Sequence, residues 1–345
     1  MWRYNEEISG GAGMSDFSKN RVLALYKILI KNTDEQHPIS MQDILDYMAS
    51  EGYSCSEDSV LRYIKQLRNE LGVDVISGRG RNARYFIGNR LLEKEELKLI
   101  IDSVNASNFI EKSIATKMID KLKSTMSKYD SEELDRSVLG INNAKAENKK
   151  ILYNVNIIQE ALAKGVQISF DYMGWDKHKK LVRKYERRYN MNPWALIWAN
   201  DRYYLYGYDV KKTGDVFVER NYRVDKLDNI QLSDVPRDGK TQYQSFNANT
   251  YVSRRMGMFS GKEQAITVRI PGYLIGAFID QFGKRITISE ESEDMLQVTF
   301  YAVPSVILLG WLAGLRAAEV VGPLDVREDI INLLQQNINL YTEKN

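Results

Sequence analysis

An aromatic stretch near the middle of the chain, Arg202–Tyr208, restricts the possible folds more strongly than any other segment. Its tyrosines Tyr204, Tyr206 and Tyr208 occupy alternate positions, so they share one side of an extended strand. The apolar segment 191–198 predicts a second strand, joined to the first by a tight turn. One face of this hairpin is therefore expected to line a core.

Three segments in and around the hairpin occur together. They are the strand with Pro193, the tripeptide Tyr203-Tyr204-Leu205, and the run Arg220-Asn221-Tyr222-Arg223-Val224-Asp225-Lys226-Leu227. This combination resembles the WYL domain, a small Sm-like β-barrel that acts as a ligand sensor in bacterial transcription regulators. Tyr203 stands where the family has its name-giving tryptophan, and the other replacements keep size and charge. The resemblance implies a WYL domain over residues 151–236.

The N-terminal part, residues 18–90, is expected to hold three helices followed by a β-hairpin. Ser40 and Ser56 are predicted N-caps of the second and third helices, and Gly72 is predicted to end the third. This order is typical of a winged helix-turn-helix, and it resembles the helix-turn-helix found in front of WYL domains. The inner stripe of the third helix is predicted to be Val60, Leu61, Ile64, Leu67 and Leu71.

The distribution of charge favours DNA as the partner of this N-terminal fold. The net charge is only +2, so a nucleic-acid surface must come from local clustering of the 48 Lys and Arg residues. Between residues 59 and 90, seven basic residues stand against two acidic ones. A basic helix that is merely solvated is the alternative. The predicted contacts to double-stranded DNA are Ser56, Ser59, Arg62, Tyr63, Lys65 and Gln66 in the third helix, all but Ser56 projecting outward, and Arg79, Arg81 and Arg84 in the hairpin.

The WYL resemblance implies an effector site and suggests a nucleotide or a nucleic acid as its ligand. Guanidinium groups pair with phosphate, and aromatic rings stack on bases. Core tyrosines and structural pairs such as Arg223 with Asp225 are the alternative, as is a solvated edge for the basic run 177–188. The predicted effector residues, expected to converge on one barrel surface, are Tyr172, Arg188, Tyr204, Arg220 and Arg223.

The remaining segments complete a multidomain α+β fold class. Residues 91–150 are expected to be a charged helical linker, serving either as a dimer contact or as a passive spacer. Residues 237–260 are predicted to be a polar linker. Residues 261–345 alternate strands and helices in a pattern similar to the C-terminal extension that often follows WYL domains. Dimerisation or closure over the ligand is the role expected for it.

Several classes of protein are excluded or disfavoured. The histidines His37 and His178 and the single Cys55 form no nucleophile–base pair or metal cluster at an informative spacing, so neither catalysis nor a cofactor is expected. The most apolar segment, 303–315, is too short to span a membrane. Residues 1–17 lack an apolar signal segment and are expected to be a flexible leader of a cytoplasmic protein.

These observations together predict a homodimeric transcriptional regulator that binds an inverted-repeat operator and responds to a ligand. The family resemblance suggests a role in stress or phage-defence control. A non-specific nucleic-acid-binding module without a regulatory ligand is the alternative from another class.

Overall fold

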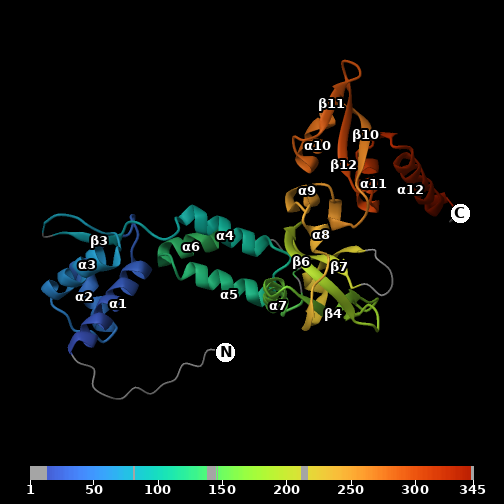
Figure 1. Ribbon diagram of the computed structural model, residues 1–345. Helices are drawn as coiled ribbons and strands as arrows, with labels where there is room; N and C mark the ends of the chain where they lie inside the picture. Colours follow the sequence, from blue (N-terminus) through green and yellow to red (C-terminus); the bar gives the residue numbers. More distant parts are fainter. Residues whose placement is uncertain (1–13, 81, 138–144, 146, 211–216, 343–345) are drawn as a thin grey trace. The chain divides into compact units, whose positions relative to one another are not determined.

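The computed structural model describes residues 14–80, 82–137, 145, 147–210 and 217–342. The chain divides into two compact units, residues 1–146 and 147–345, and each is a mixture of helices and strands (Figure 1). Residues 1–13 of the predicted leader lie outside the described residues. The rest of that leader was predicted wrongly, because the first helix already begins at Met14.

The first unit opens with three helices and a small antiparallel sheet. The elements are α1 (Met14–Asn32), β1 (Ile39–Ser40), α2 (Met41–Ser50), α3 (Glu57–Leu71), β2 (Val75–Ser77) and β3 (Arg84–Ile87), with strand order β1-β3-β2. The predicted caps are confirmed: the Ser40 and Ser56 side chains accept hydrogen bonds from the backbone N–H groups of Asp43 and Ser59. Gly72 ends α3 in the left-handed conformation, at φ 65°. The two-residue strand β1 was not predicted.

The buried face of α3 differs from the prediction. Val60, Ile64 and Leu67 are buried as expected, but Leu61 is 47% exposed and Leu71 is 57% exposed. Tyr63, which was expected to project outward, is only 2% exposed. The buried positions 60, 63, 64 and 67 form one stripe at helical spacing, and Tyr63 lies in the core that α3 shares with Leu25 and Leu29 of α1.

Three further helices complete the first unit: α4 (Lys94–Ala106), α5 (Lys112–Lys123) and α6 (Lys128–Ser137). Leu97 and Ile101 of α4 pack with Met126 and Leu134 in a small core. The polar segment 130–133 lies within α6, in agreement with the helical linker predicted for residues 91–150. Glu132 and Glu133 of this segment are exposed, whereas the next residue, Leu134, is buried.

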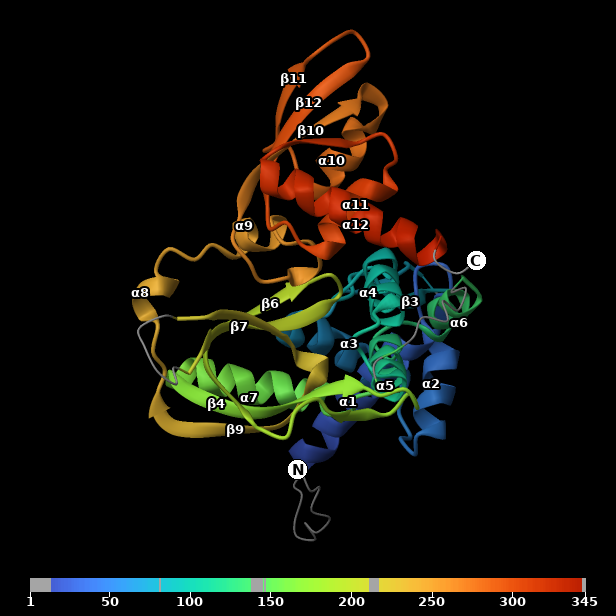
Figure 2. The same ribbon diagram turned by 90° about the vertical axis from the view of Figure 1, so that its right-hand side faces the viewer.

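The second unit begins with α7 (Ile151–Lys164), which ends at Gly165 in the left-handed conformation. A six-stranded antiparallel sheet follows, in the order β5-β4-β6-β7-β8 with β9 also paired to β4. The strands are β4 (Val166–Trp175), β5 (Leu181–Arg183), β6 (Tyr189–Ala199), β7 (Arg202–Asp209), β8 (Glu219–Arg223) and β9 (Leu227–Pro236). Irregular register between β4 and β9 helps the sheet to curl into a half-barrel, and α7 lies against β4, β6 and β9 (Figure 2).

The predicted tyrosine hairpin is confirmed as β6 and β7. Asn200 and Asp201 form its tight turn with φ values of 50° and 55°, the left-handed conformation that two-residue hairpin turns require. Every residue from Tyr204 to Tyr208 is buried. Both faces of β7 are therefore covered, whereas one core-facing side was predicted.

The C-terminal part of the second unit is a four-stranded antiparallel sheet with helices. The elements are β10 (Gln264–Pro271), α10 (Ile275–Phe282), β11 (Thr287–Glu290), β12 (Met295–Ala302), α11 (Val306–Gly314), β13 (Glu319–Gly322) and α12 (Leu324–Thr342), with strand order β11-β12-β10-β13. Its core joins Val268 and Val298 of the sheet to Phe278, Leu308 and Val326 of the three helices. The alternation of strands and helices predicted from the sequence is confirmed.

Gly207 on β7 offers a test of the packing between the two hairpin strands. A Cβ at this position would overlap the backbone carbonyl oxygen of Asn192 on β6. We expect Gly207→Ala to lower the free energy of unfolding by about 1–3 kcal/mol, because the strands cannot approach without strain. Chemical denaturation followed by circular dichroism measures this. Gly310→Ala is the matched control, since a Cβ there meets no atom within 4 Å, and an equal loss in both variants would contradict the prediction.

Candidate nucleic-acid interface and effector site

The outward face of α3 presents a short basic surface. Arg62 and Lys65 are exposed, and Arg62 lies 3.5 Å from the Ser59 hydroxyl through its Nη2 atom. The exposed Ser56 and the half-buried Ser59 lie at the start of the helix, with their hydroxyl oxygens 3.0 Å apart. Ser56, Ser59 and Arg62 are thus brought together at the start of α3, and Lys65 follows near its middle.

Other polar residues of α3 have structural roles. Arg68 donates hydrogen bonds to the Val75 carbonyl at 2.7 Å and to the Ser77 hydroxyl at 2.9 Å, so it ties α3 to β2. Gln66 is half-buried, and its Oε1 atom is buried without a hydrogen-bond partner among the described residues. Tyr63 is buried and cannot contact DNA in this conformation. Tyr63 is therefore removed from the surface predicted to contact DNA, and Gln66 lies at the edge of that surface.

The β2–β3 hairpin carries its cations at the tip and along β3. Arg79 is exposed beside Gly80, whose φ of 89° permits the turn. Arg84 is exposed and donates to the Pro38 carbonyl at 3.3 Å. The predicted contact Arg81 lies outside the described residues. Within the part of the chain that is described, Arg62, Lys65 and Arg79 form no ion pair, so their charges remain available to an anionic partner.

In the half-barrel, Tyr172, Tyr204 and Arg223 come together. Tyr204 lies directly across from Arg223 in the β7–β8 ladder, and Tyr172 is close enough to interact electrostatically with both. Burial raises the pKa of both tyrosines, although the positive charge of Arg223 opposes this. Arg223 itself is held by Asp225, to which it donates two hydrogen bonds, at 3.1 and 2.7 Å.

The Arg220 side chain of β8 lies on the opposite face of the sheet from the Arg223 side chain. Successive side chains of a strand point to opposite faces, so Arg220 shares a side with its partner Gly207, whereas Arg223 shares a side with Tyr204. The Nε atom of Arg220 donates to Asp209 at 2.9 Å, and the Tyr222 hydroxyl donates to the same carboxylate at 3.2 Å.

Arg188 belongs to a third group, on the side of β4 that carries Ser169 and Asp171. It donates to the Ser169 hydroxyl at 3.1 Å and to the Asn229 carbonyl at 2.7 Å, and its Nη1 lies 3.8 Å from Asp171. The expectation that all five effector residues converge on one surface was therefore wrong. The cause is the two-residue period of the strands, because residues three apart in β8 cannot share a face.

The structure adds a polar network that the sequence analysis missed. Residues 237–260 were predicted to be a polar linker, but they form two short helices, α8 (Lys240–Tyr243) and α9 (Ala248–Ser253), that pack on the tyrosine side of β7. Tyr206 stacks on Phe246 with ring centroids 4.3 Å apart, and it meets Tyr251 edge-on. The aromatic residues of this segment could have indicated that it packs on a core, but the many polar residues around them obscured that signal.

Glu219 of β8 lies at the centre of this network. Its carboxylate accepts hydrogen bonds from the Tyr206 hydroxyl at 3.1 Å, the Tyr251 hydroxyl at 2.8 Å and Arg255 at 3.3 Å. Arg255 is 6% exposed and lies over the Tyr251 ring, 3.6 Å from its centroid, while its other amino group pairs with Glu263. One buried guanidinium thus connects the half-barrel sheet to the segment that leads into β10.

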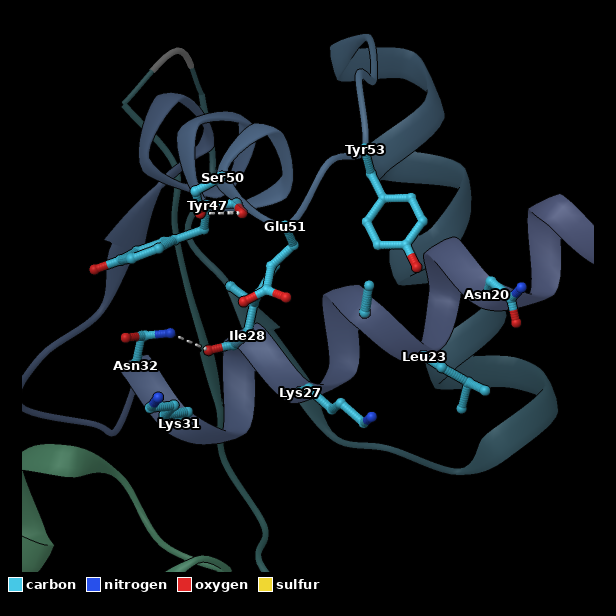
Figure 3. Close-up of a pocket in the computed structure, with 11 residues that line it drawn as sticks. Asn20, Leu23, Lys27, Ile28, Lys31, Asn32, Tyr47, Ser50, Glu51 and Tyr53 are labelled. Atoms are coloured by element: carbon cyan, nitrogen blue, oxygen red, sulfur yellow. Dashed lines mark hydrogen bonds between the residues drawn. The ribbon is translucent and has the colours of Figure 1, made fainter. Parts of the chain in front are cut away.

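A separate pocket of about 610 Å³ lies in the first unit between α1 and α2 (Figure 3). Lys27, Lys31, Tyr47, Glu51 and Tyr53 are among its lining residues. The polar groups that Figure 3 joins by dashed lines are bonded within their own helices: the Asn32 amide donates to the Ile28 carbonyl, and the Ser50 hydroxyl to that of Tyr47. The arrangement is that of a groove between helices.

The described residues offer neither a metal site nor a helix that could span a membrane. In the ranges given above, no group of three or more His, Cys, Asp and Glu side chains is arranged to hold a metal ion. No helix in the same part of the chain is long and apolar enough to cross a membrane.

Comparison with known proteins identifies the half-barrel region. Residues 153–232 match the family model of the WYL domain. The central part of the chain is therefore a WYL domain, which confirms the resemblance carried by Tyr203-Tyr204-Leu205 and the Arg220–Leu227 run. Comparison with curated proteins gives no match.

Two solved structures align over most of the chain. One is the proteasome accessory factor B/C (PafBC) of Arthrobacter aurescens, at 13% identity and a TM-score of 0.28, covering 94% of this chain and 49% of that one. The other is described as a CRISPR Cas-related protein, at 13% identity and a TM-score of 0.38, covering 98% of this chain and 89% of that one. The chain thus spans about half the length of the first structure. The WYL assignment concerns residues 153–232 and rests on the match to the family model.

The buried guanidinium network leads to a stability prediction. We expect Arg255→Ala to lower the free energy of unfolding of the second unit by about 3–5 kcal/mol, because it leaves Glu219 and Glu263 without their buried cation. Arg254→Ala is the matched control. The Arg254 guanidinium is more exposed than that of Arg255, so its removal is expected to lower the free energy of unfolding by less than about 1 kcal/mol. Denaturant titration of both variants decides the matter, and equal losses would refute a special role for Arg255.

Proposed function

We propose that this protein is a ligand-responsive transcriptional regulator that binds double-stranded operator DNA through α3 and the β2–β3 hairpin. The observation that carries the proposal is the exposed basic surface made by Arg62 and Lys65 of α3, with Arg79 at the hairpin tip, whose charges have no carboxylate partner in the described residues. Three helices followed by a small antiparallel sheet support a winged helix-turn-helix. In that fold the third helix enters the major groove and the hairpin contacts phosphates.

The proposal divides the chain by role. Residues 18–90 form the winged helix-turn-helix, residues 91–150 a helical connection, and residues 151–236 an Sm-like WYL sensor. Residues 237–260 clasp the tyrosine side of that sensor, and residues 261–345 form the C-terminal extension. Two copies read the two halves of an inverted repeat, so a change in the spacing of the paired α3 helices alters operator affinity.

The effector proposed for the WYL domain is a nucleotide or a short single-stranded nucleic acid. Support comes from Tyr172, Tyr204 and Arg223, which place an aromatic ring and a guanidinium fork beside each other. The Nε and Nη2 atoms of Arg223 donate to Asp225, which fixes the orientation of the guanidinium that a ligand would meet. Arg188 and Arg220 lie elsewhere on the domain and are assigned to structural pairs with Asp171 and Asp209.

DNA reading is tested by selecting sites from a randomised duplex pool at fixed salt. Arg62→Ala is expected to weaken the binding free energy by about 1–3 kcal/mol and to relax the preferred sequence at one position. The reason is that contacts to base edges determine which sequence is bound. Arg79→Ala is expected to weaken all sequences alike and to reduce the salt slope by about one unit. Arg285→Ala, an exposed arginine of the C-terminal part, controls for loss of charge alone. An unchanged preference in Arg62→Ala would show that α3 does not read bases.

The same selection separates the regulator from the alternative function. A module that binds nucleic acid without sequence preference would recover no palindrome, and its affinity would depend on phosphate contacts alone. Recovery of a palindrome that is lost in Arg62→Ala would exclude that alternative.

Effector binding is tested by calorimetry of the full chain with nucleotides and short single strands. Tyr172→Phe removes one hydroxyl and is expected to weaken binding about tenfold, because the proposed site pairs this hydroxyl with a charged phosphate. Tyr185→Phe, an exposed tyrosine of the same domain, is the matched control. Equal affinity of the unaltered chain and the two variants would show that the effector does not bind at Tyr172.

A further inference from the structure

The cavity in the first unit (Figure 3) is used neither by the proposed DNA contacts nor by the WYL domain. Its volume of about 610 Å³ lies within the range of small-molecule sites, roughly 300–1,000 Å³. One wall is the outer side of α1. The other contains Ser50, Glu51 and Tyr53, at the end of α2 and in the connection to α3. We name this cavity the α1–α2 groove.

The wall formed by α1 combines an apolar surface with two cations. Leu23, Lys27 and Lys31 follow each other at intervals of four residues, so they lie on one side of the helix. The opposite side carries Leu25 and Leu29, which are fully buried in the core that α1 shares with α3. Leu23 is 51% exposed. Its apolar surface is therefore available to a ligand in the groove.

The two lysines of this wall lack carboxylate partners. Both are exposed, and in the ranges that the structure describes neither Lys27 nor Lys31 forms an ion pair. Two like charges one helical turn apart repel each other and destabilise the helix. An anion bound between them would remove that repulsion and accept charge-assisted hydrogen bonds from both ammonium groups. The α1–α2 groove thus favours a negatively charged ligand.

The facing wall limits what kind of anion fits. Glu51 lines it, and this carboxylate too is without an ion pair in the described part of the chain. Its charge would repel a polyanion such as a nucleic acid, whereas a ligand with one anionic group needs only the two lysines. Tyr47 and Tyr53 are half-buried and offer ring surface to an aromatic or aliphatic body. The two walls together match a small amphipathic anion.

We propose that the α1–α2 groove is a binding site for a small amphipathic anion. The charged group lies between Lys27 and Lys31, and the apolar body packs against Leu23. This site belongs to the first unit and is separate from the effector site proposed for the WYL domain. Tyr53 lies three residues before Ser56, the N-cap of α3. The bound anion therefore contacts both the helix that packs on α3 and the connection that leads into it.

The test is equilibrium dialysis of the full chain against anilinonaphthalene sulfonate, an aromatic monoanion, and in parallel against phenylnaphthylamine, which has the same aromatic body without the sulfonate. The double variant Lys27→Gln/Lys31→Gln is expected to bind the sulfonate about tenfold or more weakly, because both charge-assisted contacts are lost. Its affinity for the neutral probe is expected to be unchanged, which also shows that the groove is intact. Probe bound elsewhere on the chain is common to all the proteins and cancels in the comparison.

The matched control is Lys117→Gln/Lys121→Gln. It removes two exposed lysines at the same spacing from α5, another helix of the first unit, and is expected to bind both probes like the unaltered chain. Leu23→Gln tests the apolar half of the site. Because this leucine is half exposed, the fold is expected to tolerate the change, and both probes are expected to bind about fivefold more weakly.

Four results would overturn the proposal. They are an unaltered chain that does not bind the sulfonate, equal sulfonate affinity in the unaltered chain and the Lys27→Gln/Lys31→Gln variant, an equal loss in the α5 control, and a Leu23→Gln variant that binds both probes normally. A loss of the neutral probe in the lysine variant equal to that of the sulfonate would likewise contradict it, since the anionic group would then make no contribution. No DNA is present, so failure of this inference and failure of the proposed function are distinguishable.

Discussion

The double burial of β7 is the constraint on which the second unit depends. Its tyrosines face the segment 240–258, and the residues between them, with Leu205 fully buried, face the other side of the sheet. A strand that serves two cores cannot slip by one residue without exchanging its entire apolar set between them. Gly207 adds a steric lock, because only a residue without Cβ allows the close approach of Asn192. The register of the hairpin is therefore strongly specified, and it determines on which face of the sheet each neighbouring arginine lies.

The clasp over the tyrosines joins two parts of the second unit through charge as well as packing. Arg255 lies between Glu219 of the sheet and Glu263 at the start of the next domain segment, and its guanidinium covers the Tyr251 ring. A cation enclosed in this way is costly to leave unpaired, so the two carboxylates hold it in one place. Any movement of β8 that displaces Glu219 changes the environment of Arg255. A physical connection thus runs from the sheet that carries Arg223 to the segment leading into β10.

The two sets of cations in this protein differ in their readiness for a ligand. Arg62 and Lys65 on α3 are exposed and without ion pairs in the described residues, as suits contact with a polyanion that supplies many phosphates. In contrast, Arg223 and Arg220 of the WYL domain are each oriented by an aspartate. A small anionic effector must share or replace that carboxylate, which favours ligands that present two acceptor oxygens at once. Different sequence environments of the same residue type therefore suit different partners.

Most of the helices and strands could be predicted from the sequence, because their signals are local; β1, α8 and α9 are exceptions. Ser40 and Ser56 cap helices, Gly72 and Gly165 end them, and the alternation of tyrosines marks β7, since each signal depends on hydrogen bonds and side-chain direction within a few residues. The WYL domain was likewise recognised from its own residues. Tertiary structure alone decided which side of each element is covered. Tyr63 is buried because α1 packs against it, Arg220 and Arg223 are separated because the register of β8 places them on opposite faces, and the polar segment 237–260 is ordered because β7 offers it an aromatic surface. Such outcomes depend on contacts between residues far apart in the chain, whose pairing no local pattern encodes.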